Sequence, residues 1–208
     1  FDLLENGVYQ ESSFQIANYD STDAEFLISS IELSNIDLAQ ILSLSTFEDG
    51  SLGDFENITN LSGEWVVGDS ASNSSEFLPF PEPPDGSSYF VLYNDDAAGE
   101  DPANAANPML YSNSIENDDQ PSLLVFDLYF PNPSGSCGDG GPYSEDFKVK
   151  VSTDDGVSWV VLDSTISTGW YWSSHMYNLE PYVLNFSSYR IGFEYSDCGG
   201  NWGYGVAV

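Results

Sequence analysis

The chain has 208 residues, 41% of them hydrophobic and 15% aromatic, which is enough for a packed core and excludes an intrinsically disordered segment. Its 34 acidic residues stand against 3 Lys and Arg residues, and the net charge of -31 makes nucleic acids and anionic membranes very poor partners because both would be repelled. The length fits one large all-β domain, or one domain of ordinary size with a flanking piece.

Short segments rich in Val, Ile, Phe and Tyr end at Gly, Pro, Asn, Asp or Ser, which is typical of antiparallel strands and turns. The pattern predicts strands at 13–18, 25–33, 40–46, 64–67, 88–93, 109–112, 122–129, 146–152, 157–164, 175–179, 189–195 and 205–208. Segment 73–86 carries four prolines and is predicted to be an extended loop. Residues 1–45 are either the end of a preceding β domain or extra strands fitted to the main domain, 46–208.

The clearest local prediction is a hairpin in "DFKVKVSTDDGVSWVVL". Phe147, Val149 and Val151 alternate with Lys148 and Lys150, so the two sets face opposite sides of a strand. The following "DDG" is a turn signal. In the second strand, the alternation of valines and Trp159 predicts that this tryptophan is buried.

The two cysteines each lie in a glycine-rich segment, Cys137 in "GSCGDGG" and Cys198 in "SDCGGNWG". In an exported protein this arrangement favours a disulfide, and a pair of free thiols is the alternative. A metal role is disfavoured because no His or further Cys lies near either residue.

From Phe47 onward, the order of several short motifs resembles the bacterial cleaved-adhesin and choice-of-anchor J domains, which are relatives of MAM-type jelly rolls. The motifs are FEDG (47–50), GEWVVG (63–68), YNDDAAG (93–99), NPMLYSNSIE (107–116), LLVFDLYF (123–130), SEDFKVKVSTDDGVSWVVL (144–162) and RIGFEYSDCGGNWGYGVAV (190–208). The resemblance implies an all-β fold, an antiparallel β-sandwich of jelly-roll type. The residues before 46 have no counterpart in that family, and the family's usual acidic stretch after the last strand would fall beyond Val208.

The resemblance also places the FEDG loop beside the acidic end of the strand that precedes "NDD". Carboxylate and amide oxygens in glycine-containing loops are the ligands that Ca²⁺ requires. The predicted calcium ligands are Glu48, Asp49, Asn94, Asp95 and Asp96, with Asp49 and Asp95 as direct ligands. The alternative is that these are ordinary solvated acids on a very acidic protein.

An enzyme is disfavoured because His175 is the only histidine and neither a G-x-S-x-G nor an H-E-x-x-H motif occurs. The aromatic residues Trp170, Trp172 and Trp202 could form a platform on which a sugar or peptide stacks, although such residues more often fill a β-sandwich core.

The sequence therefore predicts a non-catalytic, calcium-stabilised module of a secreted or cell-surface protein that binds extracellular protein or glycan surfaces or spaces neighbouring domains. The alternatives are a carbohydrate-binding accessory module of a secreted hydrolase or peptidase, and a self-assembling subunit of an extracellular filament or lattice. No apolar run is long enough to span a membrane, so no membrane insertion is expected. Because the sequence begins at Phe1 and stops at Val208 within a predicted strand, we expect it to be part of a longer, processed polypeptide.

Overall fold

The structure, a computed structural model, describes residues 45–58, 64–74, 79–95, 107–117, 122–133, 135–139, 144–164, 167–198 and 203–208. The chain divides into two compact units, Phe1–Gln40 and Ile41–Val208, and every described residue belongs to the second. The strands predicted at 13–18 and 25–33, and most of 40–46, lie outside the described residues. The domain boundary near residue 45 stays a prediction.

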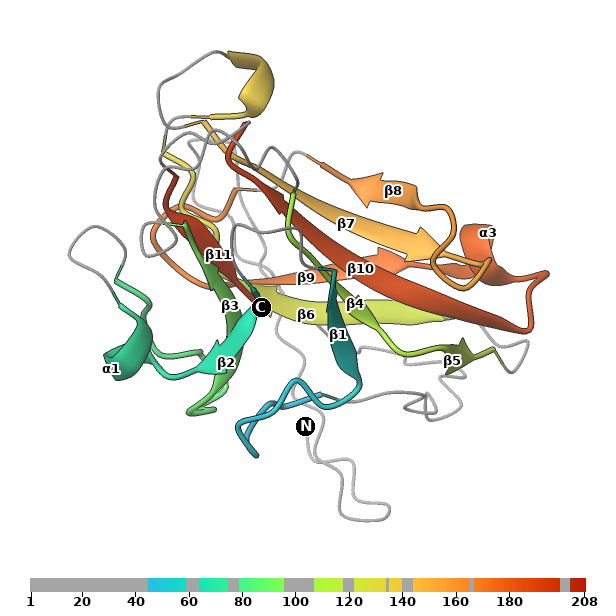
Figure 1. The fold of residues 1–208 in the computed structure, drawn as a ribbon, viewed down its shortest axis with the longest axis horizontal. Helices are drawn as coiled ribbons and strands as arrows, with labels where there is room; N and C mark the ends of the chain where they lie inside the picture. The colour runs from blue at the N-terminus through green and yellow to red at the C-terminus, as the bar shows by residue number, and fades with distance from the viewer. Residues whose placement is uncertain are drawn as a thin grey trace, which may run out of the picture. The chain divides into compact units, whose positions relative to one another are not determined.

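Six strands of the described chain form one antiparallel sheet (Figure 1). Its order is β1 (Phe55–Ile58), β4 (Met109–Ser112), β10 (Ser188–Ser196), β7 (Asp146–Ser152) and β8 (Val160–Asp163), with β5 (Ile115–Glu116) paired to the start of β10. The central pair, β7 and β10, is in register from Ser152 opposite Arg190 to Asp146 opposite Ser196. This long pair is the frame of the first sheet.

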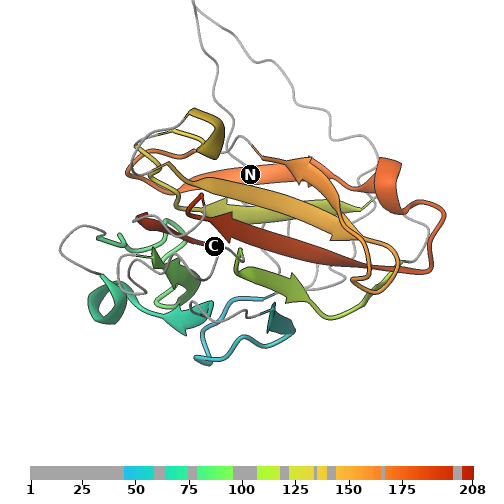
Figure 2. The same ribbon diagram turned by 45° about the horizontal axis from the view of Figure 1, so that its top comes forward.

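A second layer combines β2 (Val66–Gly68), β3 (Phe90–Asn94) and β11 (Gly205–Ala207) with the pair β6 (Leu123–Leu128) and β9 (Ser173–Asn178). Tyr129, directly after β6, forms two backbone hydrogen bonds of 2.9 Å with Ala207 of β11, which joins the two parts. In Figures 1 and 2, β6 and β9 lie in a different layer from β7 and β10. The result is an antiparallel β-sandwich.

The core lies between the layers and is made by the inward side of each alternating strand. Val91 and Tyr93 of β3 meet Phe147 of β7 and Phe193 and Tyr195 of β10, all of them at most 3% exposed. The rings of Tyr93 and Tyr195 lie 5.0 Å apart, and those of Phe147 and Phe193 lie 6.0 Å apart. The predicted alternation in β7 is confirmed, because its lysines point away from this core.

The proline-rich segment lies against the other face of β3. Phe90 packs there with Phe80, which is 2% exposed, and their rings are 5.8 Å apart. The hydroxyl of Tyr129 donates to the carbonyl oxygen of Pro79 at 2.9 Å, and the indole of Trp172 donates to that of Pro81 at 2.8 Å. The described part of the predicted loop, 73–74 and 79–86, contains no strand, as predicted, although Asn73 is the last residue of a short helix, α1 (Ser70–Asn73).

The β7–β8 turn forms at the predicted place. Asp155 and Gly156 both have positive φ, 61° and 87°, which suits a tight hairpin turn and explains the Asp-Gly pair. The following strand is shorter than predicted, because β8 begins at Val160 and Val157 is 85% exposed. Trp159 therefore precedes the strand. Its side chain is only half-buried, so the prediction that Trp159 is buried is wrong.

Sequence patterns missed two strands, β1 and β5, and the short helices α1 (Ser70–Asn73) and α3 (Glu180–Val183). In β1 only alternate residues are partly buried, so "FENI" carries a weak apolar signal. The predicted disulfide between Cys137, in the 3-10 turn η1 (Cys137–Asp139), and Cys198, after β10, is confirmed with Cα atoms 5.2 Å apart. In the described part of the chain, no helix is both long and apolar enough to cross a membrane.

Candidate functional site

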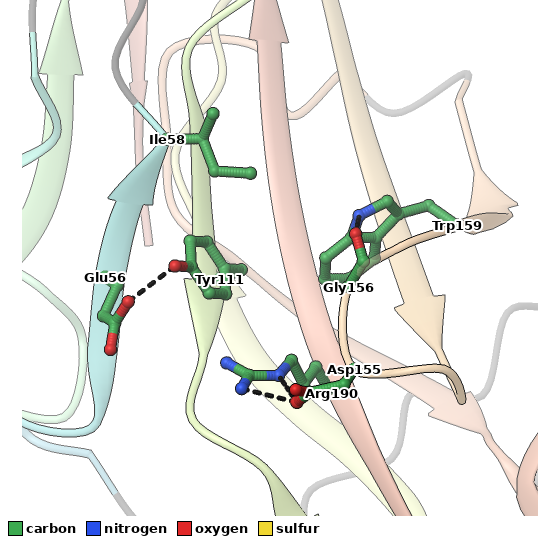
Figure 3. Close-up of a pocket in the computed structure, with 7 residues that line it drawn as sticks. All are labelled: Glu56, Ile58, Tyr111, Asp155, Gly156, Trp159 and Arg190. Atoms are coloured by element: carbon green, nitrogen blue, oxygen red, sulfur yellow. Dashed lines mark hydrogen bonds and ion pairs between the residues drawn. The ribbon is translucent and has the colours of Figure 1, made fainter.

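A small pocket of about 160 Å³ opens on the outer face of the six-stranded sheet (Figure 3). Three strands and one turn supply its walls: Glu56 and Ile58 from β1, Tyr111 from β4, Arg190 from β10, and Asp155, Gly156 and Trp159 from the β7–β8 turn and the residues after it.

Strand register explains why these distant residues meet. Glu56 of β1 lies opposite Tyr111 of β4, and Tyr111 lies opposite Gly192 of β10. Their neighbours Phe55, Leu110 and Phe193 point into the core, so this row points outward. The pocket is thus a consequence of pairing, not of one local motif.

Two aromatic rings form the floor of the pocket. Tyr111 and Trp159 meet edge to face, with ring centroids 6.4 Å apart and an angle of 69° between the planes. The indole nitrogen of Trp159 donates to the carbonyl oxygen of Gly156 at 3.1 Å, which fixes the ring. Gly192 lies beneath the ring, and a Cβ atom there would be 2.8 Å from Trp159 Cζ3. The glycine therefore makes room for the tryptophan.

Charged groups surround this floor. Arg190 Nε donates to Asp155 Oδ1 at 2.7 Å, and its guanidinium carbon lies 5.5 Å from the centroid of the Tyr111 ring. The hydroxyl of Tyr111 donates to Glu56 Oε2 at 2.5 Å, and this bond raises the pKa of the tyrosine. The Asp155 side chain is 74% exposed and that of Arg190 only 17%, so the carboxylate faces solvent while holding the guanidinium in place. Such a site can bind a small polar ligand with one apolar face.

The structure describes four of the five predicted calcium ligands and does not bring these four together. Glu48 Oε1 accepts hydrogen bonds from the backbone amides of Ser88 (2.8 Å) and Tyr89 (3.0 Å), which precede β3. Asn94 and Asp95 lie at the far end of β3, roughly 20 Å away at the usual rise of a strand. The FEDG loop is therefore beside the start of this strand, and the expectation that it lies beside the acidic end is wrong.

The other predicted ligand of the FEDG loop, Asp49, is an exposed loop residue. Its Oδ1 accepts hydrogen bonds from the amide (2.9 Å) and hydroxyl (2.8 Å) of Ser51, and the amide bond is the main cause of its lowered pKa. Asp96 lies outside the described residues. Within the described ranges, no group of three or more His, Cys, Asp or Glu side chains is arranged to hold a metal ion.

Two buried carboxylates lie beside Gly203, where the chain approaches β11. Asp95 is 3% exposed and Glu145 is fully buried, and their oxygens lie 2.9 and 2.8 Å from the position that a Cβ atom on Gly203 would take. Glu145 Oε1 accepts from the hydroxyl of Tyr195 (2.5 Å) and the amides of Tyr204 (2.7 Å) and Gly205 (2.8 Å). Its second oxygen, Oε2, has no hydrogen-bond partner among the residues that the structure describes. Sequence reasoning missed Glu145, which looks like an ordinary strand-end acid.

The structure describes two of the three tryptophans of the predicted aromatic platform. Trp170 is 48% exposed and its ring lies 5.5 Å from that of Tyr204, edge to face. Trp172 instead packs under the proline-rich segment, with its ring 5.4 Å from Phe90. Trp202 lies outside the described residues, so the platform stays a prediction.

The single histidine is half-buried on strand β9, opposite Phe126 of β6. His175 Nε2 lies 2.9 Å from the hydroxyl oxygen of Ser173, and its ring stacks 5.6 Å from Phe126 and 6.5 Å from Tyr177. Desolvation by burial lowers the pKa of His175, which favours the neutral imidazole. These contacts indicate that His175 contributes to packing through ring stacking.

Comparison with known proteins identifies the fold. No protein-family model matches the chain, and no curated protein matches it in sequence. The K1 cleaved adhesin domain of Lys-gingipain from Porphyromonas gingivalis W83 is similar in structure, with a TM-score of 0.52, 13% identity, and coverage of 78% of this chain and 91% of that one.

Two carbohydrate-binding modules are also similar, each at 16% identity over 77% of this chain. They are TmCBM61 in complex with β-1,4-galactotriose (TM-score 0.48, 88% of its chain) and Caldicellulosiruptor saccharolyticus CBM27-1 in complex with mannohexaose (TM-score 0.47, 90% of its chain). The prediction of a cleaved-adhesin-like, all-β jelly-roll sandwich is confirmed.

Proposed function

We propose that the chain is a non-catalytic binding module of an extracellular protein, and that it attaches to glycan or protein surfaces through the outer face of its six-stranded sheet. The observation that carries this proposal is the pocket on that face, where Tyr111 and Trp159 form an aromatic floor ringed by Glu56, Asp155 and Arg190. Aromatic surface combined with a few fixed polar groups is typical of ligand sites.

Other features agree with this role. The Cys137–Cys198 disulfide suits an oxidising exterior, and the acidic surface suits a medium in which salt screens charge. The Tyr111, Glu56 and Arg190 side chains engage each other rather than a buried nucleophile or base, which favours binding over catalysis.

We further propose that a Ca²⁺ ion stabilises the fold at the junction of β3 and β11. Asp95 and Glu145 would hold it, because both carboxylates are buried beside Gly203 and one oxygen of Glu145 has no hydrogen-bond partner among the described residues. The ion would supply positive charge where desolvated carboxylates otherwise repel each other. Thermal melting with and without the ion tests this part.

Binding by the intact chain tests the main proposal. We expect the chain, biotinylated at its C-terminus and displayed on streptavidin, to bind a subset of spots on a glycan array or on a panel of extracellular matrix proteins. The matched control is the same chain reduced and heat-unfolded, which should lose that binding because the pocket depends on strand pairing. A folded chain that binds no glycan and no protein above the unfolded control would contradict the proposal.

A further inference from the structure

The outer face of the six-stranded sheet differs in charge from the rest of the chain. All three basic residues of the sequence, Lys148, Lys150 and Arg190, lie on its strands β7 and β10. Lys148 Nζ lies 3.1 Å from one oxygen of Glu194 and Lys150 bonds the other, while Arg190 pairs with Asp155. In a chain of net charge -31, this is the face on which each cation has an acid beside it.

From this charge balance and from the geometry of the pocket, we infer that the pocket binds one uncharged sugar ring of a glycan. The inference rests on the binding function proposed above and assigns its ligand class. A neutral ligand can bind without breaking the protein's existing ion pairs. It also avoids the repulsion that the chain's negative net charge exerts on anions.

The pocket offers the three kinds of contact that a sugar ring needs. The half-buried indole of Trp159 presents an apolar surface for the C–H face of the ring. The carboxylates of Glu56 and Asp155 accept hydrogen bonds from hydroxyl groups, and the guanidinium of Arg190 donates them. Sugar hydroxyls both donate and accept, so acceptors and a donor around one aromatic floor match them.

The size of the pocket limits the ligand to one ring. Its volume of about 160 Å³ is well below the roughly 300 to 1,000 Å³ of sites that enclose a drug-sized ligand. Ile58, which is 38% exposed, borders the pocket and can contact a further unit of a chain without enclosing it. One enclosed ring implies weak binding to a free monosaccharide and stronger binding to clustered glycans.

Charged ligands fit this pocket less well. An acidic sugar would place its carboxylate near Glu56 and Asp155, where like charges repel. A lysine or arginine from a partner protein would bind over the face of an aromatic ring. The Tyr111 ring already has the Arg190 guanidinium 5.5 Å from its centre, so a second cation there would be repelled. An uncharged saccharide is therefore favoured over a basic peptide.

The test compares four folded proteins: wild type, Trp159→Ala, Glu56→Gln and Phe186→Ala. Each is applied to an array of neutral, acidic and amino glycans, and saturation-transfer NMR is recorded with the methyl pyranosides of glucose, galactose and mannose. We expect Trp159→Ala and Glu56→Gln to weaken neutral-glycan binding by about tenfold or more. Phe186→Ala removes a large exposed aromatic side chain outside the pocket and should bind like wild type.

Glu56 is exposed, so Glu56→Gln keeps the test decisive if Trp159→Ala fails to fold. Wild-type binding that both pocket variants retain would overturn the sugar site while leaving the binding function standing. Binding only to acidic glycans, or only to a lysine-rich peptide, would also overturn it. A wild type that binds neither glycans nor proteins would overturn the proposed function itself.

Discussion

Glu145 is a fully buried carboxyl group with no basic side chain bonded to it. Burial is the largest influence on its pKa and raises it to about 7, although the hydrogen bonds from Tyr195, Gly205 and Tyr204 act in the opposite direction. The folded state therefore holds a proton on this group at pH values where the unfolded chain, with a pKa near 4.5, has lost it.

The stability of the metal-free protein should accordingly fall as the pH rises. Because the folded pKa is the higher one, the folded state binds more protons between the two values, and the free energy of unfolding decreases over that range and levels off above about pH 7. We expect the ionisation of Glu145 to lower the free energy of unfolding by about 2 to 3 kcal/mol between pH 5 and pH 8. Urea denaturation in EDTA, comparing wild type with Glu145→Gln at both pH values, measures this difference.

The control is Glu116→Gln, which makes the same chemical change at an exposed position. It should leave the pH dependence of unfolding as it is in wild type. A difference in stability between wild type and Glu145→Gln that is the same at pH 5 and pH 8 would show that this carboxyl group does not titrate as its burial requires.

At the scale of elements, the Cys137–Cys198 disulfide ties the turn η1 to the end of β10 across 61 residues of sequence. By chain entropy, a crosslink closing a loop of this size stabilises the fold by about 4 kcal/mol. We expect Cys137→Ser, Cys198→Ser and the double variant to lose similar amounts of unfolding free energy, measured by urea denaturation. Equal denaturation midpoints for wild type with and without reductant would contradict this expectation.

The elements that sequence could predict are those whose pattern is local. In β7, apolar and basic residues alternate, and Asp155 and Gly156 provide the two positive φ angles that the turn requires. Strand β1 escaped prediction because a four-residue edge strand with two exposed positions carries little apolar signal. The position of the FEDG loop was predicted wrongly for another reason. Two loops that contact the same strand can be a strand length apart, and sequence does not say which end each one reaches.

At the scale of the whole molecule, 34 acidic residues against 3 basic ones leave most carboxylates to be balanced by ions from solution. NaCl should raise the melting temperature because it screens this repulsion. CaCl₂ at equal ionic strength should raise it further, by about 5 to 10 °C at a hundredfold excess over the dissociation constant, if Ca²⁺ binds at Asp95 and Glu145.

Calorimetry of Asp95→Asn and Asp49→Asn in EDTA, NaCl and CaCl₂ separates the two effects. Asp95→Asn should lose the increment specific to calcium, whereas Asp49→Asn, in the exposed FEDG loop, should keep it. Identical melting in CaCl₂ and matched NaCl would remove the calcium proposal. If only Asp49→Asn lost the calcium-specific rise in melting temperature, the calcium site would lie in the FEDG loop instead.

The pocket could not be predicted from sequence because its residues are brought together only by the complete sheet. Glu56, Tyr111, Trp159 and Arg190 come from four separate parts of the chain, and no single motif contains more than one of them. Pattern reasoning even placed Trp159 in the core, because alternation with valines does not show where β8 begins. The fold class, by contrast, follows from composition and turn residues spread over the whole chain.

All three basic residues lie in the paired strands β7 and β10, and this placement also affects how readily proteases cleave the protein. Trypsin cleaves after Lys and Arg, so its few target bonds in this chain are all held in the central ladder of one sheet. Digestion then requires that ladder to open, and the rate of cutting reports the population of the opened state. A protein built in this way withstands trypsin-like enzymes for as long as its longest strand pair stays closed.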